Sequence, residues 1–451
     1  MASYMVRVNY SFDDRYMLTA SMRWDGASQL SDGNKWDSFP SVALGWRLDQ
    51  ENFLYDKDWL DQLKLRLGFG ASGNAAISAY ATKGSLQENY YNFGTTSSTL
   101  GYLPSDASAK TPASMANQDL GWERTTQFNL GVDFSMLRGR INGSIDYYHT
   151  KTTDLLLAMT IPSLTGYTST YSNVGETSGY GLDIEIGGRP VVAGDFEWET
   201  RLTWSMDRSE IKALSNGRTE DVNNGWFVGE EIGVYYDYVY DGIWKSSEVD
   251  EAAKLGVDKK GNPLFKPGNI KVKDLNGDEK IDANDKAIVG YARPRWTAGW
   301  QNTFSWRGLE LSCFIVSRWD FTIPQGAMTL DGRFQSRKVD YWVKDVNENA
   351  EYYAPGINGE AKDTYASSQN YQDGSFIKMR NISLGYTFGK PVLNAIGLSS
   401  LKVYAQVLNP FFISKKCDWL DPDMTNYDNN STSAGSLTTQ RSFVFGLNFG
   451  F

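Results

Sequence analysis

The feature that most constrains the fold is an alternation of apolar and polar residues over segments of about ten residues, the length of a tilted membrane-spanning strand. One such segment covers residues 62–70, and its apolar positions are Leu63, Leu65, Leu67 and Phe69. Another closes the sequence, with Phe443, Phe445, Leu447, Phe449 and Phe451 in alternate positions. Because strand side chains point to opposite faces in turn, each segment predicts a strand with one apolar and one polar face.

We predict thirteen such strands, at 4–12, 15–24, 38–48, 62–70, 121–137, 139–150, 173–187, 195–206, 294–305, 308–318, 373–388, 399–409 and 441–451. Short connections are expected at 13–14, 49–61, 138, 188–194, 306–307 and 389–398. Long ones are expected at 25–37, 71–120, 151–172, 207–293, 319–372 and 410–440, and residues 226–244 read as a hairpin inside the fourth. This strict alternation of connection length predicts an all-β fold, an antiparallel transmembrane β-barrel with short periplasmic turns and long extracellular loops.

Composition agrees with this class of protein. No run of 18 or more apolar residues occurs among the 451, which excludes a transmembrane helix. Aromatic residues reach 14%, as expected for a barrel with aromatic girdles at both membrane interfaces. The net charge of −10 argues against a nucleic-acid partner. The two cysteines, Cys313 and Cys417, allow at most one disulfide, and the single histidine, His149, gives little basis for histidine catalysis.

Thirteen antiparallel strands cannot close on themselves, because the first and last would run parallel. An open edge in lipid would leave unpaired backbone groups, each costing several kcal/mol. The sequence also starts in strand-like residues with no basic and apolar leader. We therefore expect this chain to be the C-terminal part of a larger barrel.

Several segments resemble, in the expected order, the SusC/RagA family of TonB-dependent outer-membrane transporters. They are DDRYMLTASMRWDGAS (13–28), FPSVALGWRL (39–48), WLDQLKLRLGFGASGN (59–74), GWERTTQFNLGVDFSML (121–137), NVGETSGYGLDIEI (173–186), DLNGDEKID (274–282) and the strand that ends at Phe451. The resemblance covers essentially the whole chain, and the motifs are specific when they are taken together.

This resemblance implies a barrel of about 22 strands around a plug domain, in the outer membrane of a Bacteroidetes-type bacterium. It also implies energy supplied through TonB, a SusD-like lipoprotein partner that caps the extracellular face, and oligosaccharides or oligopeptides as substrates. The plug, the TonB box and about nine strands are expected outside this sequence.

The strongest local motif lies in the long segment 207–293, at residues 274–285. Its candidate ligands for Ca²⁺, at positions 1, 3, 5, 7, 9 and 12 of a calcium loop, are Asp274, Asn276, Asp278, the Lys280 carbonyl, Asp282 and Asp285. Two departures weaken the match, because Glu279 stands where the loop usually needs glycine and Asp285 replaces a bidentate glutamate. The alternative is a solvated acidic turn.

Aromatic residues in the segment 319–372 are candidates for stacking on sugar rings or peptide side chains. They are Trp319, Trp342, Tyr352, Tyr353 and Tyr365. The alternative for any one of them is packing of the loop on itself or on a partner.

Catalysis is not expected from the sequence. Glu230 and Glu231 are adjacent and point to opposite faces of a strand, whereas glycoside hydrolysis needs two carboxylates across one sugar. Glu197 and Glu199 share the face expected to line the barrel interior. Two alternatives to a transporter stay open, namely a passive porin or adhesin barrel and a soluble β-rich glycan-binding protein.

Overall fold

The computed structural model describes residues 1–84, 87–93, 97–103, 114–165, 167, 169–222, 224–257, 261, 263–324, 339–355, 363–416, 421–424 and 439–451. The chain divides into two units, each described here by itself. Unit 1 comprises residues 1–192, 199–221 and 227–232, and unit 2 comprises residues 193–198, 222–226 and 233–451. No helix in the described part of the chain is long and apolar enough to cross a membrane.

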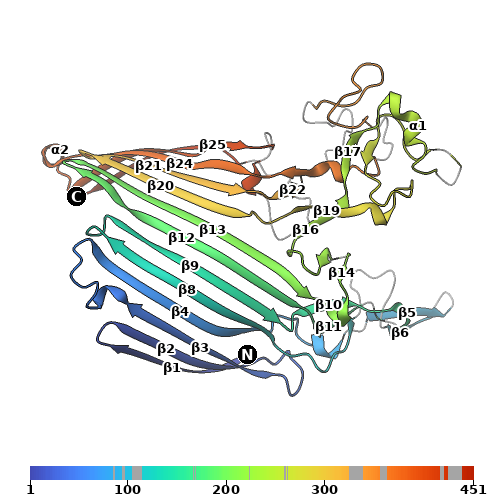
Figure 1. Ribbon diagram of the computed structural model, residues 1–451, viewed down its shortest axis with the longest axis horizontal. Helices are drawn as coiled ribbons and strands as arrows, with labels where there is room; N and C mark the ends of the chain where they lie inside the picture. Colours follow the sequence, from blue (N-terminus) through green and yellow to red (C-terminus); the bar gives the residue numbers. More distant parts are fainter. Residues whose placement is uncertain are drawn as a thin grey trace. The chain divides into compact units, whose positions relative to one another are not determined.

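Unit 1 is built on long strands that neighbour one another in chain order (Figure 1). They are β1 (Ala2–Phe12), β2 (Tyr16–Gly26), β3 (Trp36–Arg47), β4 (Leu60–Asn74), β8 (Glu123–Met136), β9 (Ile141–Thr153), β12 (Glu176–Ala193) and most of β13 (Phe196–Ala213). The pairs from β1 through β12 are antiparallel. The short 3-10 helix η1 (Leu48–Gln50) lies in the turn between β3 and β4.

Unit 2 continues the same plan with five long antiparallel strands. They are β20 (Trp296–Trp306), β21 (Leu309–Trp319), β24 (Phe376–Thr387), β25 (Ser400–Ser414) and β26 (Ser442–Gly450). Helix α2 (Lys390–Ile396) lies in the turn between β24 and β25, and the left-handed Gly397 ends it. In each unit, short turns join the strands at one end and long loops join them at the other (Figure 1).

All thirteen predicted long strands are confirmed, as is the alternation of short and long connections. The loop ends of the strands differ from the prediction. β4 reaches Asn74, β13 reaches Ala213 and β25 reaches Ser414, each four or more residues beyond the predicted end. In β4 and β13 the apolar alternation stops where both faces become small or polar. In β25 it is broken instead by consecutive apolar residues, Phe411, Phe412 and Ile413, but in all three strands the extended backbone continues.

Strand register in unit 1 aligns the apolar positions into rows across the sheet. One row runs through Tyr10, Leu18, Leu44, Leu67, Leu130, Tyr147 and Leu182. Leu44, Leu67 and Leu130 are 48%, 40% and 38% exposed, so this face is not covered by the protein. In unit 2, Leu311, Leu384, Ala405 and Phe445 form a similar row, and Phe445 is 81% exposed.

The opposite face of unit 1 is polar and internally paired. Arg66 forms ion pairs with Asp133 at 2.7 Å and with Asp146 at 2.9 Å across three strands. Thr19 donates a hydrogen bond to Asn9 at 3.0 Å. An uncovered apolar face opposite a charged, hydrogen-bonded face is the arrangement of a membrane barrel wall, with lipid outside and water inside.

The loop end of unit 1 contains several short elements and a small apolar core. The elements are η2 (Ala81–Lys83), β5 (Gln87–Phe93), β6 (Ser97–Leu103), β7 (Ser114–Met115), β10 (Leu156–Thr160), η3 (Ser163–Thr165), β11 (Ser169–Asn173), η4 (Ser215–Gly217) and β14 (Glu220–Asp221). The core consists of Ala27, Leu30, Phe39, Ala75 and Trp122.

The loop end of unit 2 is larger. Its elements are β16 (Val234–Tyr238), β17 (Tyr240–Ile243), η5 (Ser246–Glu248), α1 (Val249–Ala252), β18 (Ile270–Val272), η6 (Ala283–Asp285), β19 (Lys286–Tyr291), β22 (Thr322–Pro324), η8 (Ser368–Asn370), β23 (Tyr371–Asp373) and η9 (Pro422–Met424). β16 pairs with β19 and β17 pairs with β18. The hairpin expected at 226–244 is therefore wrong, because its two strands each pair with a segment further along the chain. The strand β15 (Trp226–Phe227) precedes them.

Cys313 lies in β21 as a free thiol, opposite Asn302 and Ile382. Cys417 lies outside the described residues.

Candidate functional site

The described loops of unit 2 form a folded subdomain with its own core, which we call the loop subdomain (residues 234–257, 261, 263–291, 339–355 and 363–373). Ile270 and Val272 of β18 pack against Tyr352 and Tyr353, with Tyr238 and Tyr365 at the edge. A second cluster contains Trp244, Ala252 and Phe265. Two segments that the sequence presents as separate long loops therefore fold as one body.

The predicted ligand-stacking residues lie largely inside this core. Tyr352 and Tyr353 are 7% and 5% exposed, and Trp342 is 7% exposed. Their rings are closed to a ligand in this structure, because burying large aromatic surface is what stabilises the loop subdomain. The packing alternative therefore describes these three residues.

Tyr365 and Trp319 are half-buried. The Tyr365 ring stacks on Phe265 with ring centroids 5.5 Å apart and meets Tyr238 edge-on at 4.9 Å. Burial raises the pKa of Tyr365 to about 12. Trp319, at the loop end of β21, stacks on Trp296 at 5.9 Å and donates a hydrogen bond to Ser317 Oγ. These contacts orient both rings within the protein.

A polar clamp ties the two segments of the loop subdomain together. The Glu348 carboxylate accepts hydrogen bonds from the Ser246 backbone at 3.0 Å, from the Ser246 hydroxyl at 2.5 Å and from the Asp345 backbone at 3.2 Å. The hydrogen bonds from Ser246 hold the pKa of Glu348 below its usual value. The clamp therefore depends on an ionised carboxylate.

Residues 274–285 form a turn that is closed by its own carboxylates. Asp274 accepts from the backbone of Gly277 and of Glu279, at 2.7 and 2.9 Å. The fully buried Asp285 accepts from the backbone of Leu275 and of Asp282, at 2.9 and 2.8 Å. Within the described residues, no group of three or more His, Cys, Asp or Glu side chains is arranged to hold a metal.

The remaining predicted calcium ligands are also engaged locally. Asn276 and Asp278 each accept a hydrogen bond from a backbone N–H two residues ahead, at 3.0 Å. Asp282 accepts from the Asn284 backbone at 2.8 Å and caps η6. Lys280 offers only its carbonyl to a cation. The donor chemistry suits Ca²⁺, but the observed contacts are those of a self-capped acidic turn.

A buried ionic cluster lies at the loop end of β21 and β24. Lys378 is 1% exposed and pairs with Asp421 and, at 3.1 Å, with Asp423. Arg380 and Arg318 also reach Asp423, at 2.6 and 3.3 Å. Since burial of a lone charge is costly, this cluster holds residues 421–424 against the strands.

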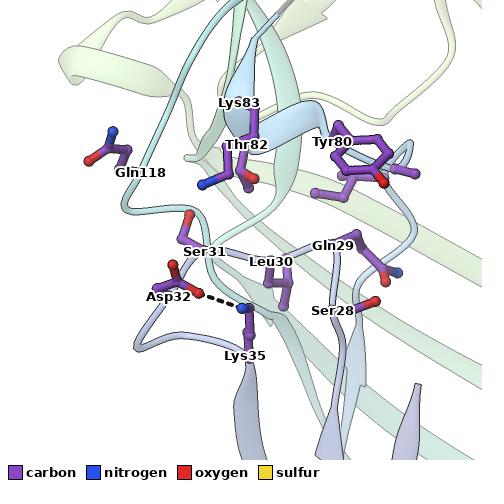
Figure 2. Close-up of a pocket in the computed structure, with 12 residues that line it drawn as sticks. Ser28, Gln29, Leu30, Ser31, Asp32, Lys35, Tyr80, Thr82, Lys83 and Gln118 are labelled. Carbon is purple, nitrogen blue, oxygen red and sulfur yellow. Dashed lines mark hydrogen bonds and ion pairs between the residues drawn. The ribbon is translucent and has the colours of Figure 1, made fainter.

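A polar pocket of about 720 Å³ lies at the loop end of unit 1 (Figure 2). Turn 27–35, between β2 and β3, forms one side, and Tyr80, Thr82 and Lys83 lie across from it. The lining residues are Ser28, Gln29, Leu30, Ser31, Asp32, Lys35, Ile77, Ala79, Tyr80, Thr82, Lys83 and Gln118. No sequence motif marks this site, because its residues come from three separate connections.

The pocket walls are fixed by hydrogen bonds among those connections. Ser31 donates its N–H to the Leu120 carbonyl at 3.1 Å, and the Ser31 hydroxyl accepts from the Leu120 N–H at 3.0 Å. Gly84 closes the η2 turn with a φ of +74°, and a Cβ there would lie 2.7 Å from the Ser114 carbonyl oxygen. The structure thus gives unit 1 a preformed polar cavity beside an apolar core.

Comparison with known proteins gives a consistent result. Residues 2–410 match the family model described as TonB dependent receptor-like, beta-barrel. TonB-dependent receptor SusC of Bacteroides thetaiotaomicron is 32% identical over 480 residues, which cover 100% of this chain and 44% of that protein. TonB-dependent receptor P26 of Formosa agariphila is 29% identical and is covered to 46%. The chain spans about half the length of the curated relatives it matches.

Solved structures agree at the level of the fold. The structure of the RagAB peptide transporter matches with a TM-score of 0.76 and 21% identity, over 100% of this chain and 47% of that chain. The RagAB peptide importer in its 'open-open' state matches with a TM-score of 0.73 and 21% identity, over 100% of this chain and 46% of that chain. Together with the SusC relative, these matches confirm the resemblance to the SusC/RagA family.

Proposed function

This chain belongs to the TonB dependent receptor-like β-barrel family, and we propose that it forms part of the lipid-embedded wall of an outer-membrane nutrient transporter. The observation that supports this proposal best is the pair of faces on the long strands. Rows of exposed apolar residues cover one face, and the Arg66, Asp133 and Asp146 ion pairs lie on the other. Uptake through a water-lined interior, rather than catalysis, is the activity that such a wall serves.

We propose that energy for uptake comes through TonB in a Bacteroidetes-type bacterium. The relatives from Bacteroides thetaiotaomicron and Formosa agariphila, which are named TonB-dependent receptors, support this proposal. Substrate uptake by cells that carry the transporter should then stop when TonB is deleted. Oligosaccharides and oligopeptides are the proposed substrates, and labelled examples of both serve as probes. Uptake that continues without TonB would instead indicate the passive porin alternative.

A SusD-like lipoprotein is the proposed partner at the extracellular loops. The loop subdomain supports this proposal, because it has its own core and carries exposed apolar residues. Val346, one of them, is 82% exposed. A photo-crosslinker at Val346 should capture the lipoprotein, whereas one at Phe449, at the turn end of β26, should capture none. Equal capture at both positions would argue against this partner surface.

Calcium binding by residues 274–285 stays a prediction. Calorimetry on the folded protein tests it directly, with Asp278→Ala as the variant and Asp250→Ala, in α1, as the control. Heat of binding that Asp278→Ala removes would support a structural Ca²⁺ site. Absence of binding heat in the unmodified protein would indicate that residues 274–285 form a self-capped turn that does not bind Ca²⁺.

A further inference from the structure

We propose that the polar pocket of unit 1 binds an acidic sugar, namely a pyranose ring that carries a carboxylate. This inference deepens the proposed function and rests on it for the side of the membrane that the pocket faces. Three properties of the pocket support it: an open aromatic ring, hydroxyl and amide groups in the lining, and the ammonium group of Lys83, which forms no ion pair within the described residues.

The aromatic ring belongs to Tyr80. It is 78% exposed, in contrast to the buried rings of the loop subdomain. Its backbone is left-handed, with φ 66° and ψ 9°, a conformation that non-glycine residues rarely adopt. Strain of this kind concentrates at ligand sites. An open tyrosine ring at the edge of a polar cavity offers the flat apolar surface on which the C–H face of a sugar packs.

Hydroxyl and amide groups line part of the cavity. Ser28, Thr82 and Gln118 provide side chains that both donate and accept hydrogen bonds. Gln29 donates its amide to the Ala75 carbonyl at 2.9 Å, which leaves its side-chain oxygen as an acceptor. Sugar hydroxyls also donate and accept, so this lining matches a carbohydrate better than an apolar peptide side chain.

The charge of the lining selects an anion. Asp32 is hydrogen-bonded to Lys35, which lowers the pKa of Asp32 and keeps it ionised. Lys83 influences Asp32 through space, and within the described residues no carboxylate lies at ion-pair distance from the Lys83 ammonium group. Among the described lining residues there are therefore two cations, Lys35 and Lys83, and one anion, Asp32, in a chain whose net charge is −10. A ligand carboxylate beside Lys83 would balance it.

Preformed walls favour binding, because little of the pocket must become ordered. Leu30 and Ser31 are 2% and 4% exposed, and Asn34 donates its side-chain amide to the Asp119 carbonyl at 2.9 Å. Turn 27–35 is therefore joined to residues 117–120 before any ligand arrives.

The test is calorimetry on the detergent-purified protein with three probes: a disaccharide ending in glucuronate, the same disaccharide ending in glucose, and an acidic tripeptide. The glucuronate probe should bind tightest. Lys83→Gln should weaken binding of the glucuronate probe by about tenfold, so that its preference over the glucose probe is lost. Tyr80→Ala should weaken binding of both sugar probes by about tenfold. Lys254→Gln, at an exposed lysine in unit 2, should change neither.

Three results would overturn the proposal: no binding of either sugar, an unchanged preference in Lys83→Gln, or tighter binding of the tripeptide. Heat-modifiable migration on gels checks that each variant is folded. Sugar binding is measured without TonB, so an absence of sugar binding would not contradict the proposed uptake function. The TonB deletion tests that function separately.

Discussion

Replacing Leu130 with arginine should destabilise the protein strongly, whereas the same change at the adjacent Asn129 should not. Leu130 lies in β8 between Leu67 and Tyr147, on the exposed apolar face. Asn129 points to the opposite face, where it lies opposite Gly68, so a longer side chain can extend into water. The two positions share one strand and one backbone ladder, and they differ in the face that they present.

The expected loss in the free energy of unfolding follows from the depth of Leu130 in the bilayer. Leu130 lies six positions before Met136, the turn end of β8. At about 3.4 Å per residue and a tilt of about 40°, this distance is about 16 Å along the membrane normal. The apolar band is about 25 Å tall, so Leu130 lies near its middle, where arginine costs about 2–4 kcal/mol. This cost corresponds to roughly 30- to 900-fold in the unfolding equilibrium constant.

Denaturant titration of the protein in lipid vesicles, followed by tryptophan fluorescence, measures the two free energies of unfolding. Leu130→Arg should lower the value by about 2–4 kcal/mol, and Asn129→Arg should stay within about 1 kcal/mol of the unmodified protein. Equal losses for the two variants, or a larger loss for Asn129→Arg, would refute the assignment of the apolar face to lipid.

Three further predictions follow from the loop ends of the strands. Lys378→Met should destabilise unit 2 by about 3–5 kcal/mol in the same titration, because it leaves Asp421 buried without its cation, whereas Lys390→Met at an exposed lysine should have little effect. The Glu348 clamp should be intact above the usual carboxyl pKa of 4.5 and be lost as the pH falls through the lower folded pKa. The protection factor of the Ser246 amide, corrected for the pH dependence of intrinsic exchange, should fall with this loss and should already be low in Glu348→Gln at about pH 7. The loop subdomain should lose stability as the pH rises from about 10 to about 12, because Tyr365 keeps its proton in the folded state, and Tyr365→Phe should reduce this loss in an alkaline unfolding titration.

The long strands could be predicted from the sequence because one physical rule sets both their pattern and their place. In β8, lipid on one side and water on the other impose alternation at Phe128, Leu130 and Val132. The rule fails beyond the bilayer, where both faces meet water, and so the loop end of β13 at Ala213 was missed. Pairing of β16 with β19 was missed for another reason, since it joins residues about fifty positions apart and no local pattern marks it.

The candidate sites, like the strands, could be predicted from the sequence only in part. The acidic residues from Asp274 to Asp285 could be located from their spacing, but the spacing does not show that Asp274 and Asp285 accept backbone hydrogen bonds. Trp342 and Tyr352 could be recognised from the sequence as aromatic residues in a loop. Only the tertiary packing shows that they are buried in the loop subdomain. The polar pocket depends on Ser31, Lys83 and Gln118 meeting across three connections, which no sequence motif records.

An accessibility scan of β25 is the direct test of whether the apolar face of the long strands contacts lipid. Spin labels placed singly at positions 401 to 407 in the membrane-embedded protein report contact with lipid-soluble oxygen and with a water-soluble nickel complex. We expect accessibility to alternate with a period of two residues. Oxygen should contact positions 401, 403, 405 and 407, and nickel should contact positions 402, 404 and 406. A scan without this alternation, or with the two sets of positions exchanged, would contradict the account.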